Sequence, residues 1–307
     1  MVCSGTMNRP AFLLDFSEWA FLRLTGLDAK SFLQGVGTQD VTPMSTARAE
    51  PTLFLTERGR PLALAWALLD QGAGATLFVE PGGRAALLPH LERLRVMEEV
   101  EFGGPNGMPR LYAVAGEGRE KTARDWAAAI PGADVVPADP MTFLLLPPGA
   151  ERPGSVATLL ASATQPASAE AWRVEQGLPR AGVDFDLDRI ATELSMPEAI
   201  SMTKGCFVGQ EVVARTSNRG AIRRRRVGFR YVAGADAGTI PSRSEILLAG
   251  GAERRAVGFV TSAVVDPATG RGLGMGYLST EIDDAEAPLT LEKEGAAIPI
   301  EIARWPL

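Results

Sequence analysis

Six short apolar runs follow Arg226, and they constrain the fold more than any other feature of the chain. They cover residues 227–232, 245–248, 256–265, 273–278, 288–292 and 297–303. Turn residues rich in Gly, Pro and Asp separate them, as in the segment 266–270. Short strands at this spacing are typical of a small barrel or sandwich. We therefore expect a C-terminal domain made of strands.

The chain before Arg226 mixes both kinds of element. Alternating or continuous apolar runs predict strands at 12–16, 20–24, 52–55, 62–69, 76–80 and 141–146. Helical patterns cover 27–34, 83–97, 125–130, 167–176 and 209–216. Gly35 and Gly177 stand just past two of these helices, where glycine commonly ends a helix. Because strands and helices do not alternate regularly, as they do in a doubly wound sheet, the pattern favours an α+β fold.

Composition limits the class of protein. The 307 residues are 46% hydrophobic and 22% charged, which fits a globular chain of two or three domains. The net charge of −6 argues against a general nucleic-acid-binding protein. One segment is nevertheless basic: residues 204–230 hold eight Lys or Arg and a single acid, Glu211. Such a segment indicates an anionic ligand or partner.

Cysteine and histidine are scarce. The two cysteines, Cys3 and Cys206, lie far apart in sequence, so we do not expect a disulfide framework. We expect instead that the protein resides in a reducing compartment. The longest apolar run, 62–69, is too short to span a bilayer, and the first residues do not resemble a signal peptide. We expect a cytoplasmic protein that does not enter a membrane. His90 is the only histidine, so no metal site is predicted.

The segment 204–211, Lys-Gly-Cys-Phe-Val-Gly-Gln-Glu, is the strongest candidate for chemistry. Its glycines, such as Gly209, allow the backbone to approach a ligand closely. Cys206 precedes a predicted helix, and both the helix dipole and neighbouring Lys204 favour a thiolate. Gln210 and Glu211 lie in the first turn of the predicted helix, and one of them can face a ligand. The alternative is that Cys206 is a small buried hydrophobic residue.

Glu175 lies near the C-terminal end of the predicted helix 167–176, where the helix dipole does not favour a carboxylate. A ring amide or amine of a ligand is one candidate partner for it. The alternative is a solvated glutamate paired with Arg173 or Arg180.

Four arginines, 223–226, follow one another. On a strand, Arg223 and Arg225 would point to one side, and Arg224 and Arg226 to the other. Either pair could bind a carboxylate or phosphate. The alternative is a solvated strand edge.

The run Lys-Gly-Cys-Phe-Val-Gly-Gln-Glu-Val-Val-Ala-Arg at 204–215 resembles the signature of the YgfZ family, relatives of the glycine cleavage T-protein. Segments 26–41, 173–179 and 257–263 resemble further motifs of that family, in the same order. The resemblance implies a three-lobed cloverleaf ring of the T-protein type with a small C-terminal β-barrel. The implied domains are a discontinuous folate-site domain (1–50 and 138–225), a second α+β domain (51–137) and the barrel (226–307).

The resemblance also implies a function. It indicates a tetrahydrofolate-binding accessory factor in iron–sulfur cluster assembly or repair, which supports iron–sulfur enzymes including those of tRNA methylthiolation. Its partners would be iron–sulfur client proteins or the assembly machinery, with no direct contact to nucleic acid. Cys206 and Lys204 would carry the chemistry. The implied folate-binding residues are Glu175, Gln210, Arg215, Arg223 and Arg225.

Two other functions remain open. A folate-dependent aminomethyltransferase of the T-protein type needs an acidic pair after a hairpin turn, but a gap-free comparison sets that pair opposite Ala63 and Leu64. Without a carboxylate there, aminomethyl transfer lacks an acid–base group, which favours the accessory factor. The arginine run suggests direct tRNA binding as the second of these functions. The net charge, and the lack of aromatic residues near the run in sequence, argue against it.

Overall fold

The computed structural model describes residues 9–104, 109–150, 166–218, 222–232, 240–249, 255–283, 287–293 and 295–307. By their internal contacts, the chain divides into two compact units. The two-sheet unit contains Met7–Thr164 and Met196–Val212, and the barrel unit contains Gln165–Ser195 and Val213–Leu307. Among the described residues, no helix is both long and apolar enough to cross a membrane.

The two-sheet unit holds a five-stranded and a four-stranded sheet, in which neighbouring strands pair antiparallel. The first has the order β3 (Glu50–Leu55), β4 (Pro61–Leu69), β5 (Ala75–Val79), β2 (Ala20–Thr25), β6 (Glu101–Gly103). The second has the order β1 (Phe12–Asp15), β7 (Arg110–Ala115), β9 (Thr142–Leu146), β8 (Asp134–Pro137). Most of these strands were predicted from sequence, but β6, β7 and β8 were not.

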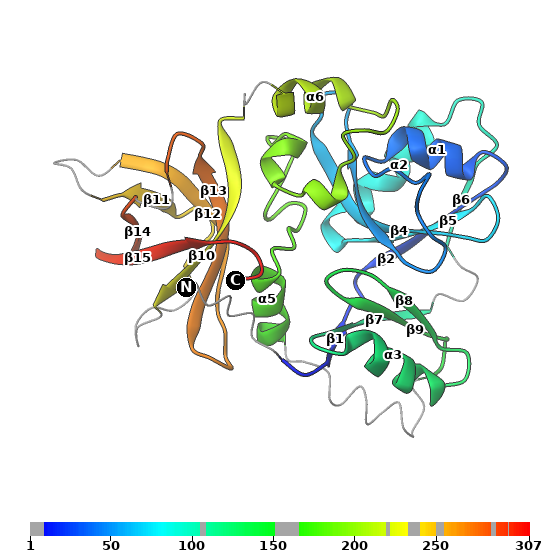
Figure 1. The fold of residues 1–307 in the computed structure, drawn as a ribbon, viewed down its shortest axis with the longest axis horizontal. Coiled ribbons are helices and arrows are strands. Elements are labelled where there is room, and N and C mark those ends of the chain that lie inside the picture. The colour runs from blue at the N-terminus through cyan, green and yellow to red at the C-terminus, as the bar shows by residue number, and fades with distance from the viewer. Residues whose placement is uncertain are drawn as a thin grey trace. The chain divides into compact units, whose positions relative to one another are not determined.

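Helices α1 (Ala29–Val36) and α2 (Arg84–Leu94) share one core with a face of the five-stranded sheet (Figure 1). The opposite face packs on the four-stranded sheet, where Phe143 stacks on Phe78 with ring centroids 4.5 Å apart. Helix α3 (Arg119–Ala128) shares a core with the other face of the four-stranded sheet. Strand β4 is thus covered on both faces, which explains its continuous apolar run.

The predicted end of the first helix is wrong. Gly35 lies inside α1, which continues to Val36, and Gly37 is the capping residue. The apolar stripe explains the two extra residues, because Phe32, Leu33 and Val36 are all buried against the sheet. Gly37 then turns to an extended backbone, and its N–H still donates to the carbonyl oxygen of Leu33 at 3.0 Å.

The barrel unit is built on a closed six-stranded barrel of antiparallel strands. Its order is β10 (Arg224–Val232), β13 (Arg271–Ser279), β12 (Arg255–Val265), β11 (Glu245–Leu248), β14 (Leu289–Lys293), β15 (Ala296–Ala303). All six strands predicted at the C-terminal end are present. Gly274 allows the closure, because a Cβ there would lie 2.1 Å from the ring of buried Phe229.

Helix α5 (Pro166–Glu175) lies against β12 and β13 of the barrel. It stops at Gly177, whose φ of 68° is left-handed, so this predicted helix end is confirmed. The short 3₁₀ turn η2 (Ala191–Leu194) contacts β10. Helix α6 (Gln210–Asn218) begins in the two-sheet unit, and its residues from Val213 onward are assigned to the barrel unit.

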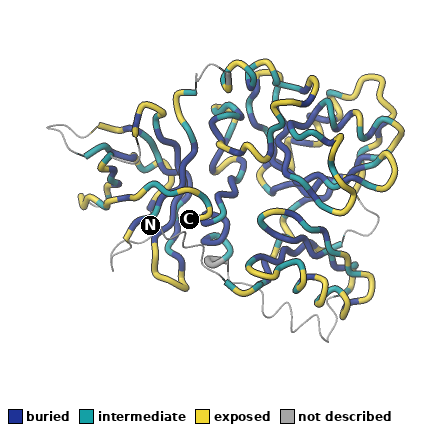
Figure 2. The backbone as a smooth tube through the Cα atoms, viewed as in Figure 1, coloured by how far each residue is buried: buried dark blue, intermediate teal, exposed yellow. Residues whose placement is uncertain are grey.

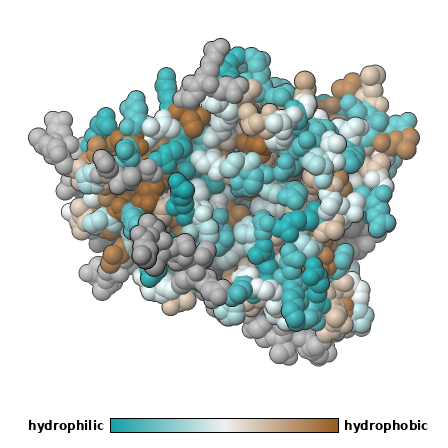
Figure 3. All heavy atoms as spheres, in the orientation of Figure 1, coloured by the Kyte–Doolittle hydropathy of each residue, from teal (hydrophilic) through white to brown (hydrophobic). Residues whose placement is uncertain are grey.

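The mixture of sheets and helices with a C-terminal barrel confirms the predicted α+β class. The domain boundaries at 50, 137 and 225 stay a prediction. Most residues of the strands are buried (dark blue in Figure 2), whereas most residues of the turns are exposed. On the face seen in Figure 3, apolar residues are interrupted by hydrophilic ones.

Candidate functional site

The loop that carries Cys206 belongs to the two-sheet unit and exposes the thiol. Cys206 is a free, exposed cysteine, so the alternative of a small buried hydrophobic residue is wrong. Its neighbour Phe207 is buried, and the Val208 N–H donates to the carbonyl oxygen of Gly35 at 3.0 Å. Gly209, with φ of 81°, passes so close to the β3–β4 turn that a Cβ would lie 2.7 Å from the Thr56 carbonyl oxygen. Packing on both sides of Cys206 therefore fixes the loop while the sulfur stays accessible.

Lys204 is one of the residues that hold this loop. Its side chain is buried, and Nζ donates to the carbonyl oxygens of Gly37 and Gln39, both at 2.7 Å. The same Nζ lies 5.3 Å from the centroid of the Phe207 ring. Burial lowers the pKa of Lys204 to about 8, although Asp40 opposes the shift. The structure thus gives Lys204 a positioning role that the sequence did not reveal.

The segment 38–41 provides the other anchors. Thr38 Oγ1 donates to the carbonyl oxygen of Ala199 at 2.5 Å, and Gln39 Nε2 donates to that of Glu198 at 2.7 Å. Hydrogen bonds from Thr42, above all from its N–H, and then from the Gln34 side chain hold the pKa of Asp40 below its usual value against the opposing effect of burial. The sequence analysis included these residues only in a motif that resembles the family. Their role as anchors could not be predicted, because their hydrogen-bond partners lie far along the chain.

Gln210 is the first residue of α6 and is half-buried, and its N–H donates to the carbonyl oxygen of Phe207 at 3.1 Å. Cys206, Lys204 and Gln210 therefore lie on one anchored loop and the helix start that follows it. Of the predicted site residues, these three belong to the two-sheet unit, and the other four belong to the barrel unit.

Glu175 ends α5 and is 4% exposed. The alternative of a solvated glutamate is therefore wrong. Arg173 and Arg180, its suggested partners, form ion pairs with Glu170, and Arg173 also pairs with Asp184. The carbonyl oxygen of Glu175 accepts a hydrogen bond from the N–H of Leu307 at 2.8 Å, so the last residue of the chain helps to hold this helix end.

A buried network around Asp184 fixes the same helix end. Arg173 Nη1 donates to Asp184 Oδ2 at 2.6 Å, and the hydroxyls of Thr261 and Ser262 donate to Oδ1 at 2.6 and 2.7 Å. Burial by itself would raise the pKa of Asp184, but Arg173 and the two hydroxyls hold it below its usual value. Asp184 is thus a charged junction between α5 and strand β12.

The arginine run separates into residues with different surroundings. Arg226 is buried, and it donates to the carbonyl oxygens of Leu194 and Gly177, both at 2.7 Å. Arg224 and Arg226 therefore do not form the predicted ligand-binding pair, because Arg226 holds the protein backbone. Arg223 and Arg224 are exposed at the start of β10, and Arg225 is half-buried.

The remaining predicted residues do not all share one pocket. Arg215 is exposed in the last turn of α6. Arg223 lines a pocket in the barrel unit, which Glu175, Arg215 and Arg225 do not line. Within the described ranges, no group of three or more Cys, His, Asp or Glu side chains could hold a metal ion.

Comparison with known proteins defines the fold class first. Residues 224–307 match the glycine cleavage T-protein C-terminal barrel domain. The structure of the glycine cleavage system aminomethyltransferase T from Bartonella henselae is similar, with a TM-score of 0.80 and 19% identity, over 96% of this chain and 86% of that chain. The protein therefore has the predicted α+β fold of the glycine cleavage T-protein type.

Sequence similarity to curated proteins gives a more specific comparison than the fold class. The chain is 28% identical to the tRNA-modifying protein YgfZ of Yersinia enterocolitica over 70% of this chain and 69% of that protein. It is 26% identical to YgfZ of Cronobacter sakazakii, over 95% and 92% of the two chains. A putative chloroplastic transferase of Arabidopsis thaliana is 24% identical, over 94% and 70%. The chain is therefore similar to YgfZ proteins, and the resemblance that its cysteine motif indicated is confirmed.

Proposed function

We propose that this protein acts in tRNA modification, as the name of its YgfZ relatives indicates, and that it does so as a tetrahydrofolate-binding accessory factor in iron–sulfur cluster assembly or repair. Its partners are iron–sulfur client proteins or the assembly machinery. The cytoplasmic location expected from cysteine usage is part of the proposal.

The exposed thiol of Cys206 on an anchored loop carries this proposal. An accessible thiol can act as a nucleophile or as a metal ligand when it ionises. One thiol cannot hold a cluster by itself, because such clusters need several ligands. Any cluster would therefore be shared with a partner protein or a small thiol, and the protein would present a single ligand at a fixed position.

The residues assigned to tetrahydrofolate suit its chemistry. The pterin ring has N–H groups that a carboxylate can bind, and Glu175 offers a buried carboxylate at a fixed helix end. The glutamyl tail is anionic and suits the guanidinium groups of Arg215, Arg223 and Arg225. Gln210 offers an amide that can both donate and accept. When bound, tetrahydrofolate would supply a reduced ring able to carry one-carbon units.

Aminomethyl transfer remains the second candidate, favoured by the T-protein fold. The positions opposite the T-protein acidic pair count against it. Ala63 and Leu64 are buried on strand β4 of the five-stranded sheet, and a Cβ at Gly83 would lie 2.6 Å from that of Ala63. No carboxylate is available at these two positions to serve as acid or base. The accessory role therefore fits the chain better.

A complementation experiment tests the role of the thiol. Cells that lack the native copy receive the wild-type gene, Cys206→Ala, Cys206→Ser or the control Cys3→Ala, and methylthiolated tRNA is measured. We expect Cys3→Ala to restore the modification and both Cys206 variants to fail at equal protein levels. Full restoration by Cys206→Ala would show that the thiol has no role.

A titration tests the folate assignment separately. Tetrahydrofolate is titrated calorimetrically into wild-type protein, Glu175→Gln and Glu175→Ala, with Glu92→Gln, at an exposed position of α2, as control. We expect both Glu175 variants to weaken binding by about tenfold or more, while thermal unfolding confirms that each variant is folded. Unchanged affinity in both would remove Glu175 from the site. Turnover of an aminomethylated carrier protein that survives Cys206→Ala would favour the transferase instead.

A further inference from the structure

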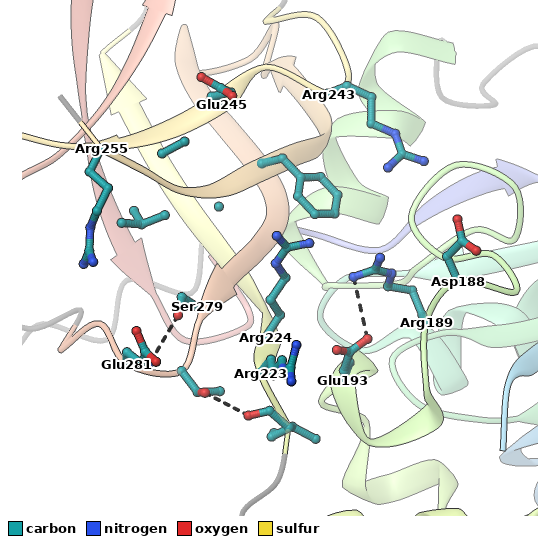
Figure 4. Close-up of a pocket in the computed structure, with 16 residues that line it drawn as sticks. Asp188, Arg189, Glu193, Arg223, Arg224, Arg243, Glu245, Arg255, Ser279 and Glu281 are labelled. Carbon is teal, nitrogen blue, oxygen red and sulfur yellow. Dashed lines mark hydrogen bonds and ion pairs between the residues drawn. The ribbon is translucent and has the colours of Figure 1, made fainter. Parts of the chain in front are cut away.

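A pocket of about 940 Å³ lies in the barrel unit, near the start of β10 and the end of β13. Five arginines line it: Arg189, Arg223, Arg224, Arg243 and Arg255. Figure 4 shows Arg224 near its centre, with Arg255 to one side and Arg189 and Arg243 to the other. Arg223 and Arg224 are consecutive, but the other three come from separate segments of the chain, so the sequence does not show the five as one group.

Several of these guanidinium groups are available to a ligand. In the part of the chain that the structure describes, no carboxylate lies within ion-pair distance of Arg223, Arg224 or Arg255. Arg243 pairs with Asp186 at 3.4 Å in an exposed, weak contact, and Arg189 pairs with Glu193 at 3.7 Å.

The pocket is not simply basic. Four acids also line it: Asp188, Glu193, Glu245 and Glu281. The field of the pocket as a whole is therefore only weakly positive. Binding of an anion would depend on individual guanidinium groups, which hold carboxylate or phosphate oxygens through directed hydrogen bonds.

An aromatic ring lies among the arginines. The guanidinium carbons of Arg224 and Arg243 are each 5.4 Å from the centroid of the Phe259 ring, and that of Arg189 is 5.7 Å away. Phe259 stacks in turn on Tyr277, with centroids 5.4 Å apart. Barrel pairing brings the two rings together, because Phe259 on β12 is the partner of Tyr277 on β13. The barrel thus supplies the aromatic platform that the arginine run lacks in sequence.

The hydroxyl of Tyr277 provides an independent observation. The residue is 1% exposed, and its oxygen has no hydrogen-bond partner in the structure. It lines a cavity of about 10 Å³ whose other walls include Arg189, Arg243 and Phe259. A buried hydroxyl normally has a partner, and this space is close to the volume that one water molecule needs. The base of the arginine cluster therefore has room for a polar atom.

We infer that this pocket binds a nucleoside phosphate, either free or as an unpaired nucleotide of an RNA. Arg224 and Arg255 hold the phosphate, and the base stacks on the guanidinium planes that lie over Phe259. Nucleobases commonly stack on aromatic rings and arginine planes in this way. A plain dicarboxylate would use only the guanidinium groups and would gain nothing from the aromatic platform. The inference goes beyond the proposed function, and the two share only Arg223.

Binding is tested with two probes of the same chemistry. Adenosine 5′-monophosphate is titrated calorimetrically, and a labelled single-stranded oligoadenylate RNA is titrated by fluorescence anisotropy. Adenosine and inorganic phosphate serve as partial ligands. Arg224→Gln, Arg255→Gln and Phe259→Leu are compared with Arg271→Gln, which changes an exposed arginine at the opposite end of β13. Arg223 is left unchanged, and tetrahydrofolate binding is measured in every variant.

We expect each of the two pocket arginine variants to lower affinity for the probe by about tenfold, as loss of one charge-assisted contact does. Phe259→Leu should weaken the nucleotide but not inorganic phosphate, and Arg271→Gln should change neither. Tighter binding of the mononucleotide indicates a free nucleotide as the natural ligand, and tighter binding of the RNA indicates an RNA source. Tetrahydrofolate affinity should stay unchanged in all variants.

The inference is overturned if neither probe binds, or if binding persists in both Arg224→Gln and Arg255→Gln. It is also overturned if a short glutamate oligomer binds while the nucleotide does not, because the ring would then have no role. Thermal unfolding of each variant shows whether a loss of binding reflects misfolding. If Phe259→Leu is unstable, the variants of the two exposed residues Arg224 and Arg255 decide the outcome. Failure of folate binding in wild-type protein would count against the proposed function alone.

Discussion

The ammonium group of Lys204 donates a hydrogen bond of 2.7 Å to the carbonyl oxygen of Gly37, which lies 167 positions earlier in the chain. Gly37 is the residue at which α1 ends. The C-terminal end of a helix carries partial negative charge, so a cation is well placed there. This contact ties the loop that presents Cys206 to the core of the two-sheet unit, and it makes Lys204 important for the geometry of the thiol.

Lys204→Met should lower the free energy of unfolding by about 2–4 kcal/mol, because it removes the donor to two carbonyl oxygens. Urea unfolding measures the change. Lys121→Met is the matched control, since Lys121 is exposed and, among the residues that the structure describes, forms its ion pair with Asp125 on its own helix. Its effect should stay within about 0.5 kcal/mol. Equal effects of the two substitutions would show that the Lys204 contacts add no stability.

The pKa of Lys204 predicts a dependence on pH. Burial lowers this pKa from 10.5 to about 8 in the folded protein. Between these two values the unfolded chain holds a proton that the folded chain has released, so stability rises with pH. The neutral amine still has N–H donors for both carbonyl oxygens. The difference in unfolding free energy between wild type and Lys204→Met should therefore grow from about pH 8 to pH 10.5. A flat or falling difference contradicts the lowered pKa.

Asp184→Asn should destabilise the protein by about 3–5 kcal/mol, because it removes the more deeply buried of the two carboxylates that pair with Arg173 and leaves only Glu170. Asp125→Asn, at an exposed helical position, serves as control. Denaturant unfolding of both variants at pH 7 gives the comparison. A loss of less than 1 kcal/mol for Asp184→Asn would mean that the network relaxes around the amide.

Acid should remove part of the same stabilisation. The pKa of Asp184 is lowered from 3.8: burial opposes ionisation, but Arg173 and the hydroxyl donors outweigh it. A lowered carboxyl pKa contributes stability above pH 3.8 that is lost as the pH falls through the folded value. Wild-type protein should therefore lose more unfolding free energy than Asp184→Asn as the pH falls from about 5 to 2. Parallel profiles would exclude Asp184 as the source.

A comparison of Gly177→Ala with Gly182→Ala distinguishes the cost of backbone strain from the cost of a side-chain clash. Both glycines have left-handed φ, of 68° and 77°. A Cβ at Gly177 would lie 2.5 Å from the Trp305 ring, whereas one at Gly182 meets nothing within 4 Å. Gly182→Ala should cost about 1–2 kcal/mol for the backbone alone, and Gly177→Ala about 2–5 kcal/mol because the ring must also move. Thermal unfolding should rank them in that order, and equal losses would contradict the close approach of Trp305.

Cys206 should react in the folded protein. In a Cys3→Ser background, a thiol reagent should label Cys206 under native conditions at a rate similar to that in urea, because the side chain is exposed. Mass spectrometry of the labelled peptide identifies the site, and Cys206→Ser gives the blank. Labelling that occurs only after unfolding would show that the thiol is protected.

The sequence predicted elements whose pattern is local. All six barrel strands, the α5 helix with its end at Gly177, and the hairpin of β3 and β4 follow from apolar periodicity and turn residues, which depend on neighbours along the chain. The predicted end of α1 was wrong, because the contact of Val36 with the sheet outweighs the tendency of Gly35 to end a helix. The strands β6 and β8 were missed in short, turn-rich stretches, and β7 was missed although residues 111–115 are an apolar run.

The sequence by itself also determined that Cys206 and Lys204 lie together, since they share one short motif. It could not show that Lys204 bonds to the end of α1, that Arg226 holds the backbone while Arg224 faces a pocket, or that Phe259 lies beside Arg224. Each of these contacts joins residues far apart in the chain. Only strand pairing and packing in the folded protein bring such residues together, and the tertiary structure therefore decided how the charged groups are used.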